Sequence, residues 1–419
     1  MEERRVVITG MGVVAPNGIG VKNFWDSLVH GRSAVRRITR FDASSYPSQI
    51  AAEVSDFDPT DYMDPKTAKR LGRFAQFALA AAQMAVEDSD IDFTVEDPYK
   101  IGVFIGTGIG GGDIIETQNS VFFEKGFKRI SPYTAVSVST HSASGIISCK
   151  FHLKGPNTTI AAGCNSGLDA AYLAFNAIRL GDADVMIVGA GEAPITPLCY
   201  AIFCASGNLS RENSHPEKAV KPYDVNAGGM VLGEGGGVLV MEELKHALLR
   251  KAKIYGEVLG YSSANEAFNL FGIETDNGAM AFNFNQVLNN SHIDIKDIGY
   301  ISAHGNGILS YDVDETEAIK KVFGELAYNI PVTSIKPVTG HSISATGIWQ
   351  TITSLLAIKN GIIPPTINIQ NPAPKCDLNY LPNGFLKKEV QTVLINAHGF
   401  GGRLTTLIVR KFFRSESTT

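Results

Sequence analysis

The chain has 419 residues, enough for two or three domains, and its 44% hydrophobic and 19% charged residues with 42 glycines describe a globular protein rich in tight turns. The formal net charge of −5 excludes the global basic field that a nucleic-acid partner requires. No apolar run is long enough to cross a bilayer, and MEERRVVITG lacks the apolar stretch of a signal peptide. We therefore expect a cytoplasmic protein with neither a nucleic-acid nor a membrane partner.

Strand-like apolar runs alternate with longer helical segments along the whole chain, which predicts α/β layering with largely parallel strands. The expected strands lie within residues 5–16, 99–112, 157–162, 184–191, 236–243, 254–263, 298–305, 331–335 and 390–413, and the expected helices within 67–89, 166–180, 243–252, 279–290, 315–324 and 345–361. Two series of elements follow the same plan. We predict two related halves, residues 1–254 and 255–413, and a polar tail at 414–419.

Cys164 lies in TTIAAGCNSGLDAA, where an apolar run ends in small residues and a helical pattern begins at once. A cysteine at such a junction lies near the N–H groups of a helix N-terminus, which favour the nucleophilic thiolate. The alternative is an ordinary core cysteine. None of the five cysteines forms a CxxC pair, and no histidines have HExxH spacing, so we predict reduced thiols and no metal.

Two histidines follow expected strands in the second half: His304 in YISAHGNG and His341 in IKPVTGHSISATG. Each alone is as easily a structural residue, but two at equivalent strand ends indicate an active-site face. Lys336 precedes His341, and an acidic run follows His304. A buried lysine there would need a carboxylate partner. The alternative is a surface lysine.

Two glycine-rich loops are also candidates. Residues 106–111 read GTGIGG after a strand and satisfy GxGxxG, but no acidic residue follows on a convincing next strand, which favours a structural turn over a dinucleotide site. Phe400 lies in NAHGFGG, where flanking glycines permit close backbone approach to a ligand. A tight hairpin is the alternative there.

Taken together, four motifs resemble those of the β-ketoacyl synthases of the thiolase-fold superfamily: AAGCNSGLDAA, SAHGNGI, SIKPVTGHSISATG and NAHGFGG. They occur in the order typical of the family, and the resemblance covers residues 3–412. The resemblance implies an α/β thiolase fold with mixed five-stranded sheets in a layered αβαβα arrangement. It implies a decarboxylative Claisen condensation in which Cys164 carries an acyl or polyketide chain and malonyl-acyl carrier protein supplies the extender. No bound cofactor is implied, because the substrates arrive on the phosphopantetheine arm of the carrier protein.

The resemblance also implies roles for individual residues. His304 and His341 would stabilise the enolate formed when malonyl loses carbon dioxide. Lys336, paired with Glu315, would organise the two histidines. Phe400 would gate the entrance, and its N–H would form the oxyanion hole together with that of Cys164.

Several positions depart from the family pattern. Asn306 and Ile308 replace two threonines that bind the pantetheine arm, and His398 replaces a phenylalanine. Residues 227–230, which usually read Arg-Asp-Gly-Phe, are Ala227, Gly228, Gly229 and Met230. We interpret these departures as an altered substrate or partner with retained catalysis.

AGCNSGLDAA and GEAPITPLCYAIFCASGNLSREN are most similar to the catalytic alpha ketosynthase of type II polyketide synthases, which pairs with a chain-length factor that lacks the cysteine. A homodimeric fatty-acid 3-oxoacyl synthase is the alternative, and a non-catalytic carrier-binding scaffold is a third interpretation. Lys66, Lys69 and Arg70 are candidates for docking the acidic carrier protein, with a solvated helix face as their alternative.

Overall fold

The computed structural model describes residues 4–270, 272–274 and 276–414, and most of the expected polar tail lies outside them. Its centre is a mixed sheet of eleven strands in the order β11-β10-β14-β15-β9-β1-β8-β7-β5-β6, with β2 (Gly18–Ile19) added beside β1. Two short two-stranded sheets lie apart from it: β3 (Arg36–Arg37) with β4 (Ile50–Ala51), and β12 (Ile362–Ile363) with β13 (Leu386–Lys387).

Each half of the chain contributes five strands with the same pairing. The first half supplies β1 (Val6–Ala15), β5 (Ile101–Gly106), β6 (Asn157–Ile160), β7 (Val185–Glu192) and β8 (Gly235–Glu243). The second supplies β9 (Gly256–Asn265), β10 (Tyr300–Ser302), β11 (Val332–Thr333), β14 (Thr392–Gly399) and β15 (Arg403–Arg410). In each set, three parallel strands are followed by two antiparallel ones. The antiparallel contact between β1 and β9 joins the two sets.

The strand directions correct one expectation. The sequence pattern predicted largely parallel strands, whereas β8, β1, β9 and β15 are all antiparallel to their neighbours. For β14 and β15 the reason is the connection: they are joined by a short glycine turn, and a tight turn can link only antiparallel strands.

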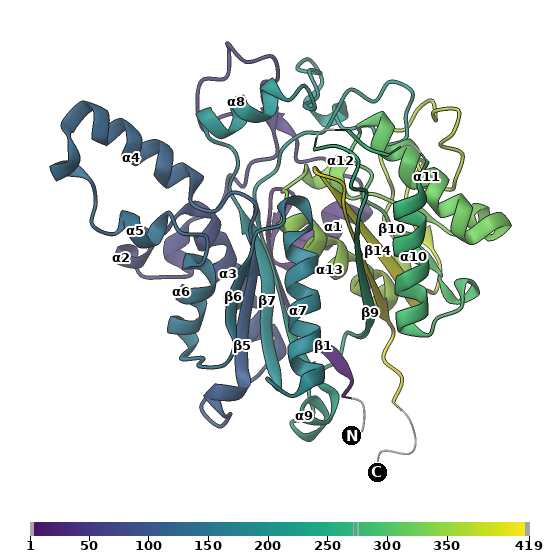
Figure 1. Cartoon of the computed structure of the whole chain (residues 1–419), viewed down its shortest axis with the longest axis horizontal. Helices are drawn as coiled ribbons and strands as arrows, with labels where there is room; N and C mark the ends of the chain where they lie inside the picture. The colour runs from purple at the N-terminus through teal and green to yellow at the C-terminus, as the bar shows by residue number, and fades with distance from the viewer. Residues whose placement is uncertain (1–3, 271, 275, 415–419) are drawn as a thin grey trace.

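Helices pack in three layers around the two five-stranded groups. In Figure 1, α3 and α6 cover the outer face of the first group, α7 and α13 lie between the groups, and α10 and α11 cover the second. The helices are α1 (Val21–Val29), α2 (Pro65–Ala68), α3 (Arg73–Ser89), α4 (Gly112–Lys125), α5 (Thr134–Ser137), α6 (Ser142–Phe151), α7 (Ser166–Leu180), α8 (Pro197–Ala205), α9 (Leu244–Leu249), α10 (Gly278–Ser291), α11 (Leu309–Phe323), α12 (Lys336–Thr339) and α13 (Ala345–Asn360). This is the expected αβαβα arrangement.

The middle layer is the most buried part of the molecule. From Ala345 through Ile358, every residue of α13 is buried, including Trp349. The alanines and glycines of α7 and α13 let the two helices approach each other closely between the sheets. Turns that begin these two helices are therefore held in a rigid frame.

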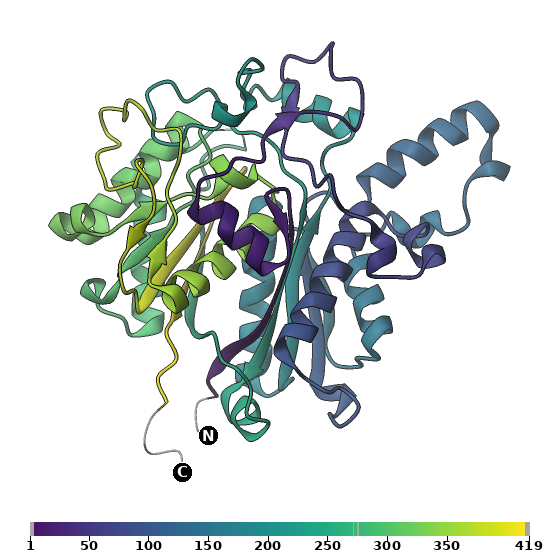
Figure 2. The same cartoon turned by 180° about the vertical axis from the view of Figure 1, so that it is seen from behind.

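One further difference from expectation and one further feature concern the surface. The helix expected over 67–89 is two helices, α2 and α3, because Gly72 is extended and begins α3 anew. The arm formed by α4 and the residues after it extends away from the body (Figures 1 and 2). Among the described helices, none is long and apolar enough to cross a membrane.

Candidate active site

Cys164 lies in a short 3₁₀ turn, Gly163–Asn165, between β6 and α7. The expected helix follows, and it ends at Gly181, whose φ of 83° is readily adopted only by a residue without a side chain. The Sγ atom of Cys164 lies 3.2 Å from Nε2 of His341, and the backbone N–H of Phe400 donates to the sulfur. The structure thus brings together a cysteine, a histidine and the glycine loop that are far apart in the sequence.

The environment of the thiol differs from the one that the sequence predicted. Burial raises the pKa of Cys164 to about 11, although the positive charge of Lys336 and the N–H of Phe400 lower it. The position before a helix was expected to favour the thiolate, but loss of hydration outweighs the helix terminus. The cysteine is therefore a thiol at neutral pH and needs a base, and His341 is the base within reach.

His341 is held between α12 and α13. Its Nδ1 lies 3.2 Å from the hydroxyl of Thr346, which accepts a hydrogen bond from the backbone N–H of Ser342. Burial, together with the charge of Lys336, lowers the pKa of His341 well below its usual value. The ring is neutral at physiological pH and can accept a proton from the thiol.

His304 follows β10, and its ring meets that of His341 edge-on, with centroids 5.5 Å apart. The backbone N–H of His398 donates to Nδ1 of His304 over 3.2 Å, which leaves the proton of a neutral ring on Nε2. Burial, together with the charge of Lys336, lowers the pKa of His304 well below its usual value. The side-chain amide of Asn306 lies 3.2 Å from Nε2, so one departure from the family pattern touches this histidine directly.

Lys336 begins α12 and is fully buried rather than on the surface. Its Nζ donates to the backbone carbonyl of His304 and lies 3.4 Å from Nδ1 of the same ring. Burial lowers the pKa of Lys336 to about 8, although Glu315 opposes the shift. We expected Lys336 to pair directly with Glu315. The structure shows no such contact between these two described side chains, because other donors bind the Glu315 oxygens.

Those donors make Glu315 the centre of a buried network. Its carboxylate accepts from the backbone N–H groups of His304 (2.7 Å) and Gly305 (2.9 Å), from the hydroxyl of Tyr223 (3.1 Å) and from the side-chain amide of Asn396 (2.5 Å). Glu315 therefore holds the His304 loop, and it acts on Lys336 only through its charge.

Sequence reasoning missed three supporting residues: Tyr223 and Asn396, which bind Glu315, and Thr346, which contacts His341. Asn396 lies two residues before His398 within a predicted strand, so its position on the strand was the one signal available. Thr346 lies within the motif SIKPVTGHSISATG but was not singled out, and Tyr223 was not singled out either.

The glycine loop at 106–111 is filled by a carboxylate of the protein itself. Glu192, at the end of β7, accepts from the backbone N–H groups of Gly108 (2.6 Å) and Ile109 (3.1 Å) and from the hydroxyl of Thr107 (3.2 Å). Donors that would bind a nucleotide phosphate are already used. The loop is a structural turn, as the sequence favoured.

Phe400 is half-buried in the turn between β14 and β15. A side chain at Gly399 would collide with Asn165, so this glycine lets the loop lie directly against the cysteine turn. Cys164, Phe400 and the departure residue Ile308 pack against one apolar cluster, whose buried members include Met230.

The other departures lie beside the His304 loop. The backbone N–H of Gly229 donates to the carbonyl of Gly307 over 2.9 Å, which joins residues 227–230 to the loop of Asn306 and Ile308. Replacements at both places therefore change one continuous surface next to the cysteine.

The three basic candidates for docking lie at α2 and the turn after it, not on the first turns of α3. Lys66 and Lys69 are exposed, whereas the guanidinium of Arg70 stacks on the ring of Tyr133 at 3.7 Å. Asp64 caps α2, and Gly72 separates it from α3.

A single group of potential metal ligands is present among the described residues: Glu266, Asp314 and His398. The sequence predicted none, because these three residues come from distant segments.

Comparison with known proteins matches residues 3–247 to the β-ketoacyl synthase N-terminal domain and residues 255–370 to the β-ketoacyl synthase C-terminal domain. The 3-oxoacyl-[acyl-carrier-protein] synthase 2 of Coxiella burnetii is 42% identical over 99% of this chain and 100% of its own length. A putative polyketide β-ketoacyl synthase 1 of Streptomyces halstedii is 40% identical over 97% of this chain and 98% of its own.

Solved structures show the same similarity. One is a type II polyketide synthase acyl-carrier protein in complex with its ketosynthase bound to the hexaketide. It matches this chain with a TM-score of 0.91 and 34% sequence identity, over 98% of this chain and 100% of that chain. The ishigamide ketosynthase/chain length factor has a TM-score of 0.92, 31% identity and the same coverage. Matches of this extent over both halves establish that the chain belongs to the β-ketoacyl synthase family of condensing acyltransferases.

Proposed function

We propose that Cys164 takes an acyl chain from a carrier-protein thioester. The observation that carries the proposal is the 3.2 Å contact between Cys164 Sγ and His341 Nε2, with the Phe400 N–H on the same sulfur. His341 removes the thiol proton as the sulfur attacks the thioester carbonyl, and the proton then goes to the departing pantetheine sulfur. The N–H groups of Cys164 and Phe400 stabilise the oxyanion.

The second stage uses both histidines. Malonyl-acyl carrier protein loses carbon dioxide, and the enolate oxygen accepts hydrogen bonds from the neutral rings of His304 and His341. The enolate carbon attacks the thioester carbonyl on Cys164, a carbon–carbon bond forms, and the carbon–sulfur bond to Cys164 breaks. The departing thiolate takes up one proton from solvent and returns to the thiol. Lowered pKa values keep both rings neutral, so each carries one N–H. Proton removal from the thiol needs a free Nε2 on His341, whereas the enolate needs an Nε2–H, so this ring changes tautomer between the two stages, with Nδ1 then accepting from the Thr346 hydroxyl.

Lys336, Glu315 and Phe400 have supporting roles in this proposal. The Lys336 ammonium holds the His304 carbonyl and depresses the pKa of both histidines, and Glu315 fixes the His304 loop. Phe400 gates the approach to Cys164 from the glycine turn. The reaction needs no cofactor bound by the protein, because the acyl groups arrive on the carrier protein.

We favour the alpha ketosynthase of a type II polyketide synthase as the pathway. Support comes from the polyketide assemblies among the similar structures, and from the departures at Asn306, Ile308 and 227–230, which line the cysteine surface. The 42% identity to a 3-oxoacyl synthase 2 favours the alternative, a homodimeric fatty-acid enzyme. A non-catalytic scaffold is the weakest interpretation, because the whole Cys164–His304–His341–Lys336 set is assembled.

A second ketosynthase-like chain is the proposed permanent partner, in the polyketide case a chain-length factor. The extended arm of α4 and the residues after it, with α8, carries exposed apolar side chains that a partner would cover. They are Phe122, Phe123, Phe127, Tyr133, Val136, Leu198 and Ile202. The cytoplasmic location and the division at residue 254 stay predictions.

The deciding experiment is co-purification of the chain with the products of its neighbouring genes, followed by mass spectrometry of what the complex makes from malonyl-acyl carrier protein. Recovery of a homologue without the cysteine, together with poly-β-ketone products, supports the polyketide proposal. A homodimer that makes saturated chains with reducing partners overturns it in favour of the fatty-acid alternative.

The docking proposal has a separate test. Reversing the charges of Lys66 and Lys69 to glutamate is expected to weaken carrier-protein binding at low salt, because both side chains are exposed and the carrier is acidic. Reversing the charge of Lys296, an exposed lysine in the second half of the chain, is the matched control. Unchanged affinity in the double variant rejects this docking surface.

A further inference from the structure

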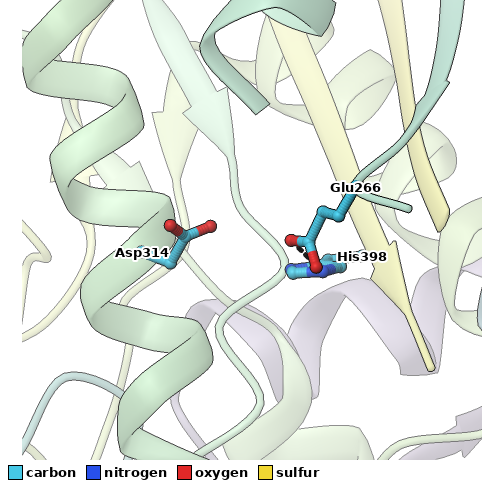
Figure 3. Close-up of side chains that lie close together, drawn as sticks. All are labelled: Glu266, Asp314 and His398. Atoms are coloured by element: carbon cyan, nitrogen blue, oxygen red, sulfur yellow. Dashed lines mark ion pairs between the residues drawn. The ribbon is translucent and has the colours of Figure 1, made fainter. Parts of the chain in front are cut away.

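Glu266, Asp314 and His398 converge from three different elements beside the glycine turn. Figure 3 shows Glu266, which directly follows β9, with its carboxylate against the imidazole of His398 on β14, while Asp314 faces both from α11. One ligand-type atom from each residue lies within 4.8 Å of the others. The closest pair is Glu266 Oε1 and His398 Nε2, at 2.9 Å.

These groups are buried without adequate hydrogen-bond partners. Glu266, Asp314 and His398 are 8%, 4% and 2% exposed. Within the described part of the chain, both oxygens of Asp314, both ring nitrogens of His398 and Oε1 of Glu266 lack a hydrogen bond. The contact between Glu266 and His398 is close but not aligned as a hydrogen bond. Buried polar atoms left in this state are costly unless a ligand satisfies them.

The surrounding charge calls for a cation. Besides Glu266, the carboxylates of Glu315, Asp276 and Glu274 lie near enough to Asp314 to add their negative charge to the site. The aromatic ring of Tyr311 closes the side of the site, with its centroid 4.6 Å from that of His398. Excess negative charge among buried side chains is relieved by a proton or by a metal ion.

We propose that Glu266, Asp314 and His398 bind a divalent transition-metal ion, Zn²⁺ or Mn²⁺, with water completing the coordination. One imidazole nitrogen and two carboxylate oxygens form a donor set that these ions accept. Ligand atoms of a tetrahedral site lie about 3.3 Å apart for bonds of about 2.0 Å, so the side chains need to close by roughly 1.5 Å at most. Glu266 is already oriented for this, because the N–H of Glu274 donates to its other oxygen, Oε2, over 3.2 Å.

The ion would tie the glycine turn to two neighbouring segments. The turn already bonds to the segment after β9: Glu266 N–H donates to the Gly402 carbonyl (2.8 Å), and Gly401 N–H donates to the Leu270 carbonyl (3.1 Å). A metal held by His398 and Asp314 adds α11 to this junction, two residues from Phe400. The site is a positioning element for the turn, and it goes beyond the proposed condensation chemistry.

Metal content of the whole chain tests the proposal directly. The protein, prepared without chelators, is incubated with Zn²⁺ or Mn²⁺, desalted and measured by inductively coupled plasma mass spectrometry. We expect about one ion per chain, and an at least tenfold loss of retained metal in both Asp314→Asn and His398→Phe. Glu317→Gln, three residues further along α11 and partly exposed, is the matched control and keeps the ion. Circular dichroism confirms that each variant is folded.

Two results overturn the proposal. One is wild-type protein that retains neither ion, which shows that a shared proton neutralises the cluster. The other is retention that survives in both folded variants but disappears in Cys164→Ala, which places the ion on the catalytic thiol. Anomalous diffraction at the zinc or manganese edge locates the ion independently of any activity.

Discussion

The two halves of the molecule bury charge in opposite ways. In the first half, Glu242 on β8 is fully buried, yet hydrogen bonds from Arg250, His246 and Thr9 outweigh burial and lower its pKa to about 2. In the second half, Lys336 is equally buried, but its nearest contacts are a carbonyl and a neutral ring, and burial lowers its pKa to about 8.

This difference separates a charge that stabilises the fold from one that is available for chemistry. Direct partners keep Glu242 ionised at any pH the protein meets. Among the described side chains, Lys336 has no carboxylate in direct contact, and its pKa of about 8 lies close to physiological pH. Its charge acts on the two histidines and the thiol around it. The same strand pattern thus supports a closed ion-pair cluster in one half and the proposed reactive centre in the other.

Removing the thiol breaks the reactive centre most completely. Cys164→Ala is expected to abolish chain elongation and to lower acylation of the protein by radiolabelled acyl carrier protein at least about 1,000-fold, because no other group can form the thioester. Cys204→Ala is the control: this half-exposed cysteine packs against the same apolar cluster but lies outside the catalytic contacts. Persistent acylation of Cys164→Ala would contradict the assignment.

Removing either histidine tests the enolate role. His304→Ala and His341→Ala should each reduce malonyl decarboxylation about 100-fold, measured as release of labelled carbon dioxide, because a hydrogen bond to the enolate is lost. His246→Gln, in the ion-pair cluster of the first half, should decarboxylate at the wild-type rate. Normal decarboxylation in both catalytic variants would exclude the role.

The pH dependence of thiol alkylation sharpens the comparison further. With the pKa of Cys164 at about 11, its thiolate fraction and its rate with iodoacetamide should rise roughly tenfold per pH unit from pH 7 to 10. Mass spectrometry of the Cys164 peptide gives the rate at each pH. A plateau below pH 8 would instead indicate a preformed thiolate–imidazolium pair with His341.

Local patterns predicted the parts of this centre that lie within a single strand–turn–helix unit. The cysteine junction and its helix, the strand end at His304 and the turn at Phe400 are all encoded over fewer than about twenty residues each. His341 was also expected at a strand end, but the short helix α12 separates it from β11. The related halves were visible as a repeated order of elements, which the strand pairing then reproduced.

Such local patterns could not predict how deeply a side chain is buried or which distant residues it contacts. A helix N-terminus can be identified in the sequence, but the loss of hydration that raises the pKa of Cys164 cannot. Charge reasoning required only some carboxylate partner for Lys336, and the family resemblance implied Glu315. The fold instead gives Glu315 four other donors, two of them on the distant residues Tyr223 and Asn396. The cluster of Glu266, Asp314 and His398 has no motif, because its members are separated by dozens of residues.

The smallest expected effect concerns the ion-pair cluster of the first half. Hydrogen bonds to Glu242 and Glu96 raise the pKa of His246 to about 9, from 6.5. A raised pKa contributes stability below about pH 6.5 that is lost as the pH rises through 9. His246→Gln should therefore lower the free energy of unfolding by about 2 kcal/mol at pH 6, a value reduced for partial solvent screening, and the gap should close by pH 9.5. Urea unfolding at the two pH values measures it. A gap that is the same at both would mean that the His246 charge contributes nothing, and the contrast between the halves would then rest on Glu242 and Arg250 alone.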